Sequence, residues 1–115
     1  MSLGPPENSS KPLTVIEVLT LLRDHWGVSY DLRLVVRGNC LYLQVMWAYL
    51  EQKSFRLNEE EYLQSLAYVL DVINRLGQAA LVRHWLLHCS SKPRLGKALS
   101  LQLKMDQGGL KEFVL

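Results

Sequence analysis

The sequence predicts a small two-layer α+β domain from its length, its composition and the order of its hydrophobic periodicities. With 115 residues, 49% of them hydrophobic and 21% charged, the chain has the size and composition of one globular domain. Helix-type and strand-type periodicities follow one another in the order α-β-β-α-α-β. We therefore expect a three-stranded sheet, antiparallel or mixed, that buries one face against the helices.

A first helix is expected over about residues 15–26. Thr14 and Glu17 have the spacing of a capping box, in which each residue caps the backbone N–H of the other. At the other end, Gly27 can adopt the left-handed backbone conformation that ends a helix. The predicted apolar face of this helix consists of Val15, Ile16, Leu19, Leu22 and Trp26.

A β-hairpin follows, because the hydrophobic pattern changes to a period of two. Its first strand, 30–36, has a solvent-exposed face that includes Asp31. Gly38-Asn39 then forms a two-residue turn. The second strand has Leu41, Leu43, Val45, Trp47 and Tyr49 on one face and Cys40, Tyr42, Gln44, Met46 and Ala48 on the other. Either this strand is central, with partial cover on both faces, or its second face meets a partner.

Two further helices and a last strand complete the predicted fold. Asn58 and Glu61 form a second capping-box pattern, and the helix that they begin ends at Gly77. A third helix covers about residues 78–89, and its predicted buried stripe consists of Leu81, Val82, Trp85, Leu86 and Cys89. Leu99, Leu101 and Leu103 alternate in the last strand, whose place in the sheet stays open.

The expected organisation is a disordered tail over 1–12, a single domain over 13–104 and a loose tail over 105–115. The N-terminus lacks the basic start and apolar stretch of a secretory signal, and no apolar run approaches the length of a membrane span. We therefore expect a cytoplasmic protein, in which Cys40 and Cys89 stay reduced and serve as small core residues.

The charge is unevenly distributed along the chain. Residues 1–82 contain seven Lys/Arg and nine Asp/Glu, whereas residues 83–115 contain six and two. Three of these cations, Lys92, Arg94 and Lys97, lie in one loop, where Gly96 permits a tight turn. The loop is either a solvated connection or a clasp for a phosphate or a carboxylate surface.

The other residues that could bind a metal, act as a nucleophile or stack on a base are better explained as structural residues. His84 and His88 have metal-ligand spacing on a helix, but Cys89 points elsewhere and no further ligand is apparent, so we expect no metal. No serine or cysteine lies in a nucleophile motif, and no cofactor motif is present, so we expect no enzyme. Trp47 and Tyr49, which resemble a base-stacking platform, are expected in the core.

Three segments together resemble a known family. They are Leu22–Gly27 with Tyr30-Asp31, the stretch Leu43–Gln52, and Lys92–Ala98. Over about residues 13–104 the chain is similar to a small family of cyanobacteria and plastids known only as a domain of unknown function. The resemblance implies that the protein comes from an oxygenic phototroph and, in general terms, that it supports photosynthetic complexes. It supplies no activity, cofactor or catalytic residue.

These observations favour a non-enzymatic protein-binding module. The predicted docking residues are Lys92, Arg94, Gly96 and Lys97, with Gln44, Met46, Glu51 and Gln52 as neighbours. RNA binding through the same loop is the alternative, and it would be strongly salt-dependent. A small enzyme is the third hypothesis, which a deep pocket with a perturbed acid or base would support.

Overall fold

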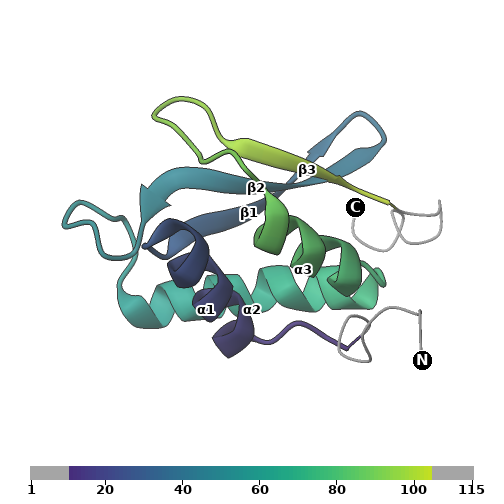
Figure 1. The fold of residues 1–115 in the computed structure, drawn as a ribbon, viewed down its shortest axis with the longest axis horizontal. Helices are drawn as coiled ribbons and strands as arrows, with labels where there is room; N and C mark the ends of the chain where they lie inside the picture. The colour runs from purple at the N-terminus through teal and green to yellow at the C-terminus, as the bar shows by residue number, and fades with distance from the viewer. Residues whose placement is uncertain (1–10, 105–115) are drawn as a thin grey trace.

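The computed structural model describes residues 11–104, so the predicted tail over 105–115 and most of the predicted N-terminal tail lie outside the described residues. A three-stranded sheet forms one layer and all three helices lie against one of its faces (Figure 1). The predicted fold class and element order are therefore confirmed. The helices are α1 (Val15–Trp26), α2 (Glu59–Arg75) and α3 (Ala79–His88).

The sheet is antiparallel throughout, with the strand order β1-β2-β3. Its strands are β1 (Tyr30–Arg37), β2 (Cys40–Tyr49) and β3 (Leu99–Leu103). The pairing of Arg37 with Cys40 closes the predicted two-residue turn, where Gly38 has a φ of 60°. β3 pairs with β2 rather than with β1, which makes β2 the central strand and answers the question that the sequence left open.

The helix caps follow the sequence with one exception. In α2 both halves of the capping box form: the Asn58 side chain accepts from the Glu61 N–H, and the Glu61 carboxylate accepts from the Asn58 N–H. In α1 the Thr14 hydroxyl accepts from the Glu17 N–H at 3.2 Å. The predicted return bond from Glu17 is wrong, because the Glu17 carboxylate binds the guanidinium of Arg83 instead.

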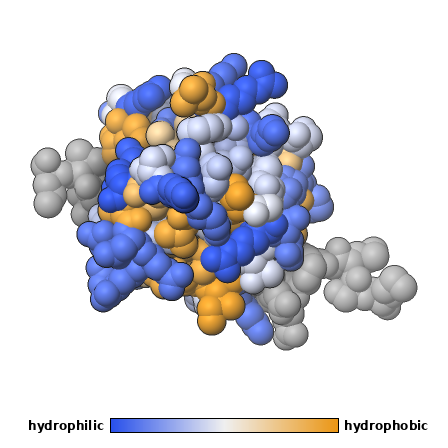
Figure 2. Space-filling model, turned by 90° about the vertical axis from the view of Figure 1, so that its left-hand side faces the viewer, coloured by the Kyte–Doolittle hydropathy of each residue, from blue (hydrophilic) through white to orange (hydrophobic). Residues whose placement is uncertain are grey.

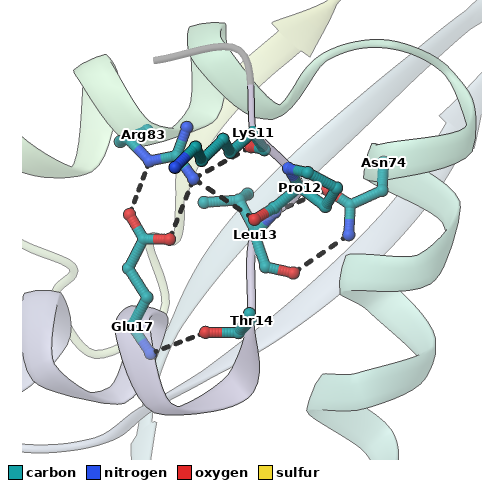
Figure 3. A network of polar contacts seen from close by, with 7 residues as sticks. All are labelled: Lys11, Pro12, Leu13, Thr14, Glu17, Asn74 and Arg83. Carbon is teal, nitrogen blue, oxygen red and sulfur yellow. Dashed lines mark hydrogen bonds and ion pairs between the residues drawn. The ribbon is translucent and has the colours of Figure 1, made fainter. Parts of the chain in front are cut away.

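This ion pair belongs to a network that fastens the N-terminal segment to two helices (Figure 3). Arg83 of α3 donates to both carboxylate oxygens of Glu17 and to the Lys11 and Pro12 carbonyl oxygens. Asn74 of α2 exchanges two hydrogen bonds with the backbone of Leu13, at 2.8 and 3.0 Å. We call these contacts the N-terminal latch. It joins the start of the described chain to α2 and α3.

The latch makes part of the stability dependent on pH. The hydrogen bond from Arg83 holds the pKa of Glu17 below its ordinary value of 4.5, against the opposing effect of burial. A carboxyl with a lower pKa when folded is protonated more readily in the unfolded chain, so acid favours unfolding. We expect denaturation midpoints to hold near neutral pH and to fall below about pH 5. Denaturant titrations of the native chain and of Glu17→Gln over that range test this, because the variant should have the shallower acid slope; parallel slopes would contradict it.

The core lies between the helices and the inner face of the sheet. The strand β2 contributes Leu41, Leu43 and Val45, and α2 contributes Tyr62, Leu66, Val69, Leu70, Val72 and Ile73. In α1, however, the buried residues are Val18 and Leu22, whereas Ile16 is 79% exposed. The prediction for Ile16 is wrong because, at 100° per residue, its side chain points about 120° away from that of Leu22. Cys40 and Cys89 are free and only half-buried, so neither is the core residue that the sequence predicted.

The far end of the hairpin departs from regular alternation. Leu32 pairs with Val45 but Tyr30 pairs with Tyr49, so β2 has extra residues at this point. Such a bulge turns side chains away from the faces that a period of two predicts. The predicted core position of Trp47 is accordingly wrong: it is 37% exposed at the sheet end, with its ring against Tyr49.

The sequence predicts Asp31 on the solvent-exposed face of β1, yet this side chain is buried, at 1% exposure. One oxygen of its carboxylate accepts from Arg33 and from Arg56, at 3.1 Å each. Arg56 belongs to the connection between β2 and α2, which therefore attaches to the start of β1. The period-two pattern missed this burial because the cover comes from a distant loop.

The second face of β2 carries no described helix, because all three helices lie on the other side of the sheet (Figure 1). The sequence left open whether both faces of β2 have partial cover or whether the second face meets a partner. The helices α1, α2 and α3 do not cover that second face. The five side chains on this face are each half-buried by their neighbours within the sheet.

None of the helices α1, α2 and α3 has the combination of length and apolar character that crossing a lipid bilayer requires.

Candidate functional site: a basic groove at one end of the sheet

The C-terminal turn of α1 holds the start of the α3–β3 connection. The ring of His25 bonds through Nε2 to the Cys89 carbonyl oxygen at 2.5 Å, and the Trp26 indole N–H donates to the Ser91 carbonyl at 3.0 Å. Since a carbonyl oxygen only accepts, Nε2 of His25 carries the proton. Gly27, at φ 84°, ends α1 immediately beyond these two residues and donates its N–H to the Arg23 carbonyl. The helix end therefore presents two aromatic rings to the loop.

The tip of this connection is a tight turn. Arg94 and Lys97 exchange two backbone hydrogen bonds, at 3.0 and 2.8 Å. Gly96 lies between them at φ 80°, a conformation that a residue with a side chain adopts only with strain. Leu95 is the other residue between them, and it is 79% exposed. The turn thus presents an apolar side chain between two cations.

A groove of about 660 Å³ lies between this loop and the end of α1. We call it the basic groove; its lining residues are His25, Trp26, Cys89, Ser90, Ser91, Lys92, Arg94, Lys97, Ala98 and Leu99. Three of them are cations and none is acidic. Within residues 11–104, no hydrogen bond or ion pair engages the side chains of those cations. The groove therefore has positive charge that the described part of the chain leaves uncompensated.

A second polar cluster lies on the other side of the same helix end. The Ser29 N–H and hydroxyl donate to the two oxygens of Glu51, at 2.8 Å each, and Arg23 Nε donates to the Ser29 hydroxyl. Burial on its own would raise the pKa of Glu51, but these hydrogen bonds and the charge of Arg23 hold it below its ordinary value. Glu51 thus fastens β2 to the end of α1, which is a structural role.

The predicted docking residues do not form a single site. Lys92, Arg94 and Lys97 line the basic groove, and Gly96 shapes the turn between the latter two. Glu51 and Gln52 line a separate pocket of about 530 Å³ beside the β2–α2 connection.

Gln44 and Met46 lie elsewhere again, half-buried on the outer face of β2. Gln44 donates to the Ser100 hydroxyl, at 3.1 Å, one residue beyond Leu99 of the groove. The outer sheet face and the groove are therefore neighbouring surfaces joined at the start of β3.

His25, Trp26 and Leu95 are the site residues that sequence reasoning missed. The first two lie 64 and 65 residues before the carbonyls that they bind, so no local pattern could pair them. The sequence could have indicated Leu95 as a site residue, because it stands between two cations in a turn with glycine. The ring centroids of His84 and His88 lie 4.4 Å apart, yet residues 11–104 hold no group of three His, Cys, Asp or Glu side chains suited to a metal.

The three segments that carry the family resemblance meet at this end of the molecule. Residues 22–31 contact the loop through His25 and Trp26, and they contact the stretch 43–52 through Ser29 and Glu51. In Figure 1 the α3–β3 and β2–α2 connections both lie at the left-hand end. Figure 2 looks onto that end, where hydrophilic and hydrophobic side chains lie next to one another.

The fold and this groove define a small two-layer α+β protein with a basic surface site formed by loops. The chain belongs to the family described as a domain of unknown function (DUF3067), which matches residues 16–114. It is similar to the Alr2454 protein of the cyanobacterium Nostoc sp. strain PCC 7120, a structural genomics target whose structure was solved by solution NMR. The two are 39% identical with a TM-score of 0.78, over 90% of this chain and 99% of that one.

These comparisons confirm the resemblance to an uncharacterised family with a cyanobacterial member. No functionally curated protein matches the chain.

Proposed function

We propose that this protein is a non-enzymatic binding module that docks an acidic surface of a partner protein in the basic groove. The observation that carries the proposal is the set of three cations, Lys92, Arg94 and Lys97, which surround the groove without a described carboxylate partner. Complementary charge across an interface steers encounter and fixes orientation. An acidic partner surface would supply the missing compensation.

The turn at the loop tip supports the same function. Leu95 is a ready apolar contact at the centre of the charged group, and its backbone is held by the two hydrogen bonds between Arg94 and Lys97. A rigid loop loses little conformational freedom on binding, which favours affinity. An apolar anchor ringed by charge is the usual anatomy of a docking patch.

We further propose that the module serves as an accessory or assembly factor in an oxygenic phototroph, a setting that agrees with the cyanobacterial source of the relative. The outer sheet face, with Gln44 and Met46, adjoins the groove through Ser100 and extends the surface open to a partner. Glu51 is not part of this docking surface, because Ser29 and Arg23 already engage its carboxylate.

The test is a co-purification from cyanobacterial lysate. The baits are the native chain, the triple variant Lys92→Ala/Arg94→Ala/Lys97→Ala, and a matched variant Arg37→Ala/Lys53→Ala/Lys104→Ala. The matched variant removes the same charge from exposed positions outside the groove. We expect specific proteins with the native chain and the matched variant, reduced roughly tenfold or more with the groove variant.

Circular dichroism and thermal melting establish that all three baits are folded. Equal recovery by the native chain and the folded groove variant would contradict the proposal. Recovery of RNA instead of protein, lost when the salt is raised from about 50 to 200 mM, would favour nucleic-acid binding.

A further inference from the structure

We infer that the basic groove binds a phosphoryl group, so that the partner segment docked there is a phosphorylated protein segment. This inference rests on the docking function proposed above and adds the chemistry of the recognised group. Three features carry it: the amount of uncompensated charge, the polar groups left free in the groove, and the size of the groove.

The charge favours a phosphoryl group over a single carboxylate. Lys92, Arg94 and Lys97 line one groove to which residues 11–104 contribute no acidic side chain. A phosphate monoester carries about −1.5 to −2 charges near neutral pH and has three acceptor oxygens, whereas one carboxylate carries a single charge. The charge and hydrogen-bond donors of one guanidinium and two ammonium groups match a phosphate better than they match a single carboxylate.

The remaining polar groups of the groove suit an anion. The carbonyl oxygens of Cys89 and Ser91, which would otherwise repel it, already accept from His25 and Trp26. The hydroxyl-bearing residues Ser90 and Ser91 are exposed in the groove wall. A hydroxyl donates to a phosphate oxygen as readily as it accepts, so these two serines add two possible donors to the groove wall.

The dimensions and rigidity of the groove also suit a small charged group. Its volume of about 660 Å³ lies within the usual range of ligand sites and accommodates a phosphoryl group with its adjoining side chain. The two backbone hydrogen bonds of the turn fix the backbone positions from which the Arg94 and Lys97 side chains extend. Because the loop backbone does not have to fold on binding, even a small phosphate ester should bind measurably.

Trp26 is a built-in reporter for this inference. Its indole N–H bonds to the Ser91 carbonyl in the groove wall, so a bound anion should shift its NMR signal. Trp85, on α3 and outside the groove lining, serves as the internal control. We would titrate the ¹⁵N-labelled full chain with O-phosphoserine, inorganic phosphate and glutamate at matched ionic strength.

We expect O-phosphoserine and phosphate to shift the Trp26 indole signal saturably in the millimolar range, and glutamate to bind at least about tenfold more weakly. The variant Lys92→Ala/Arg94→Ala/Lys97→Ala should lose at least about tenfold in affinity for phosphoserine. The matched variant Arg37→Ala/Lys53→Ala/Lys104→Ala should retain the native affinity within about twofold.

Four outcomes would overturn the inference: no saturable shift up to about 50 mM, equal affinity for glutamate and phosphoserine, undiminished binding by the folded groove variant, or displacement of phosphoserine by an RNA oligonucleotide at about 150 mM salt. Equal affinity for glutamate would remove the phosphoryl preference but leave docking of an acidic protein surface intact. Loss of lysate partners by the groove variant without any phosphoserine binding would lead to the same conclusion. Failure of both experiments would remove the docking function itself.

Discussion

Replacing Tyr62 by alanine is expected to lower the free energy of unfolding by about 4 kcal/mol. Tyr62 is the largest fully buried side chain described, 1% exposed on the inner face of α2. Its ring lies 5.9 Å from that of Phe55, and its hydroxyl donates to the Tyr30 carbonyl at 2.9 Å. The truncation would remove a hydrogen bond and leave a cavity between α2 and β1. Denaturant unfolding followed by circular dichroism measures the loss.

The variant Tyr62→Phe separates these two contributions. It keeps the ring and removes only the hydroxyl, so we expect a loss of about 1 kcal/mol. Burial, with the nearby charge of Asp31, raises the pKa of Tyr62 far above its ordinary value, so the hydroxyl is a donor at neutral pH. A phenylalanine variant as unstable as the alanine variant would mean that the hydrogen bond, and not the packing, dominates.

Replacing Arg83 by methionine is expected to lower the free energy of unfolding by about 2 to 3 kcal/mol. The Arg83 side chain is 11% exposed and donates to Glu17, Lys11 and Pro12, so its loss would open one half of the N-terminal latch. The value lies below that for a fully buried pair because Glu17 is 33% exposed and can be hydrated once its partner is gone.

A double-mutant cycle with Glu17→Gln isolates the ion pair from the other contacts. We expect a coupling energy of about 1 to 2 kcal/mol, measured from the unfolding free energies of the native chain, the two single variants and the double variant. Hydrogen exchange should show faster opening of residues 11–14 in the Arg83 variant. A coupling near zero would mean that the backbone contacts of Arg83 and the Asn74 bonds hold the segment without the ion pair.

The sequence predicted the cationic part of the basic groove but not its walls. Lys92, Arg94 and Lys97 stand close together along the chain around Gly96, so local reasoning finds them. His25 and Trp26 reach the groove only because α1 packs beside the end of α3, which no local pattern contains. The predicted neighbours Glu51 and Gln52 face a different pocket, because Glu51 binds the backbone and hydroxyl of Ser29.

The sequence by itself determined the elements of this protein and their order. Periodicity, caps and glycine stops act within a few residues, so the bounds of α1, the hairpin turn and both halves of the α2 capping box follow from local residues alone. Only the tertiary structure decided where β3 pairs, why Asp31 is buried and why Glu17 turns to Arg83 rather than back to its own helix. Each of these outcomes is a competition in which a partner far along the chain offers a charge-assisted contact or a sheet edge that outweighs the local alternative.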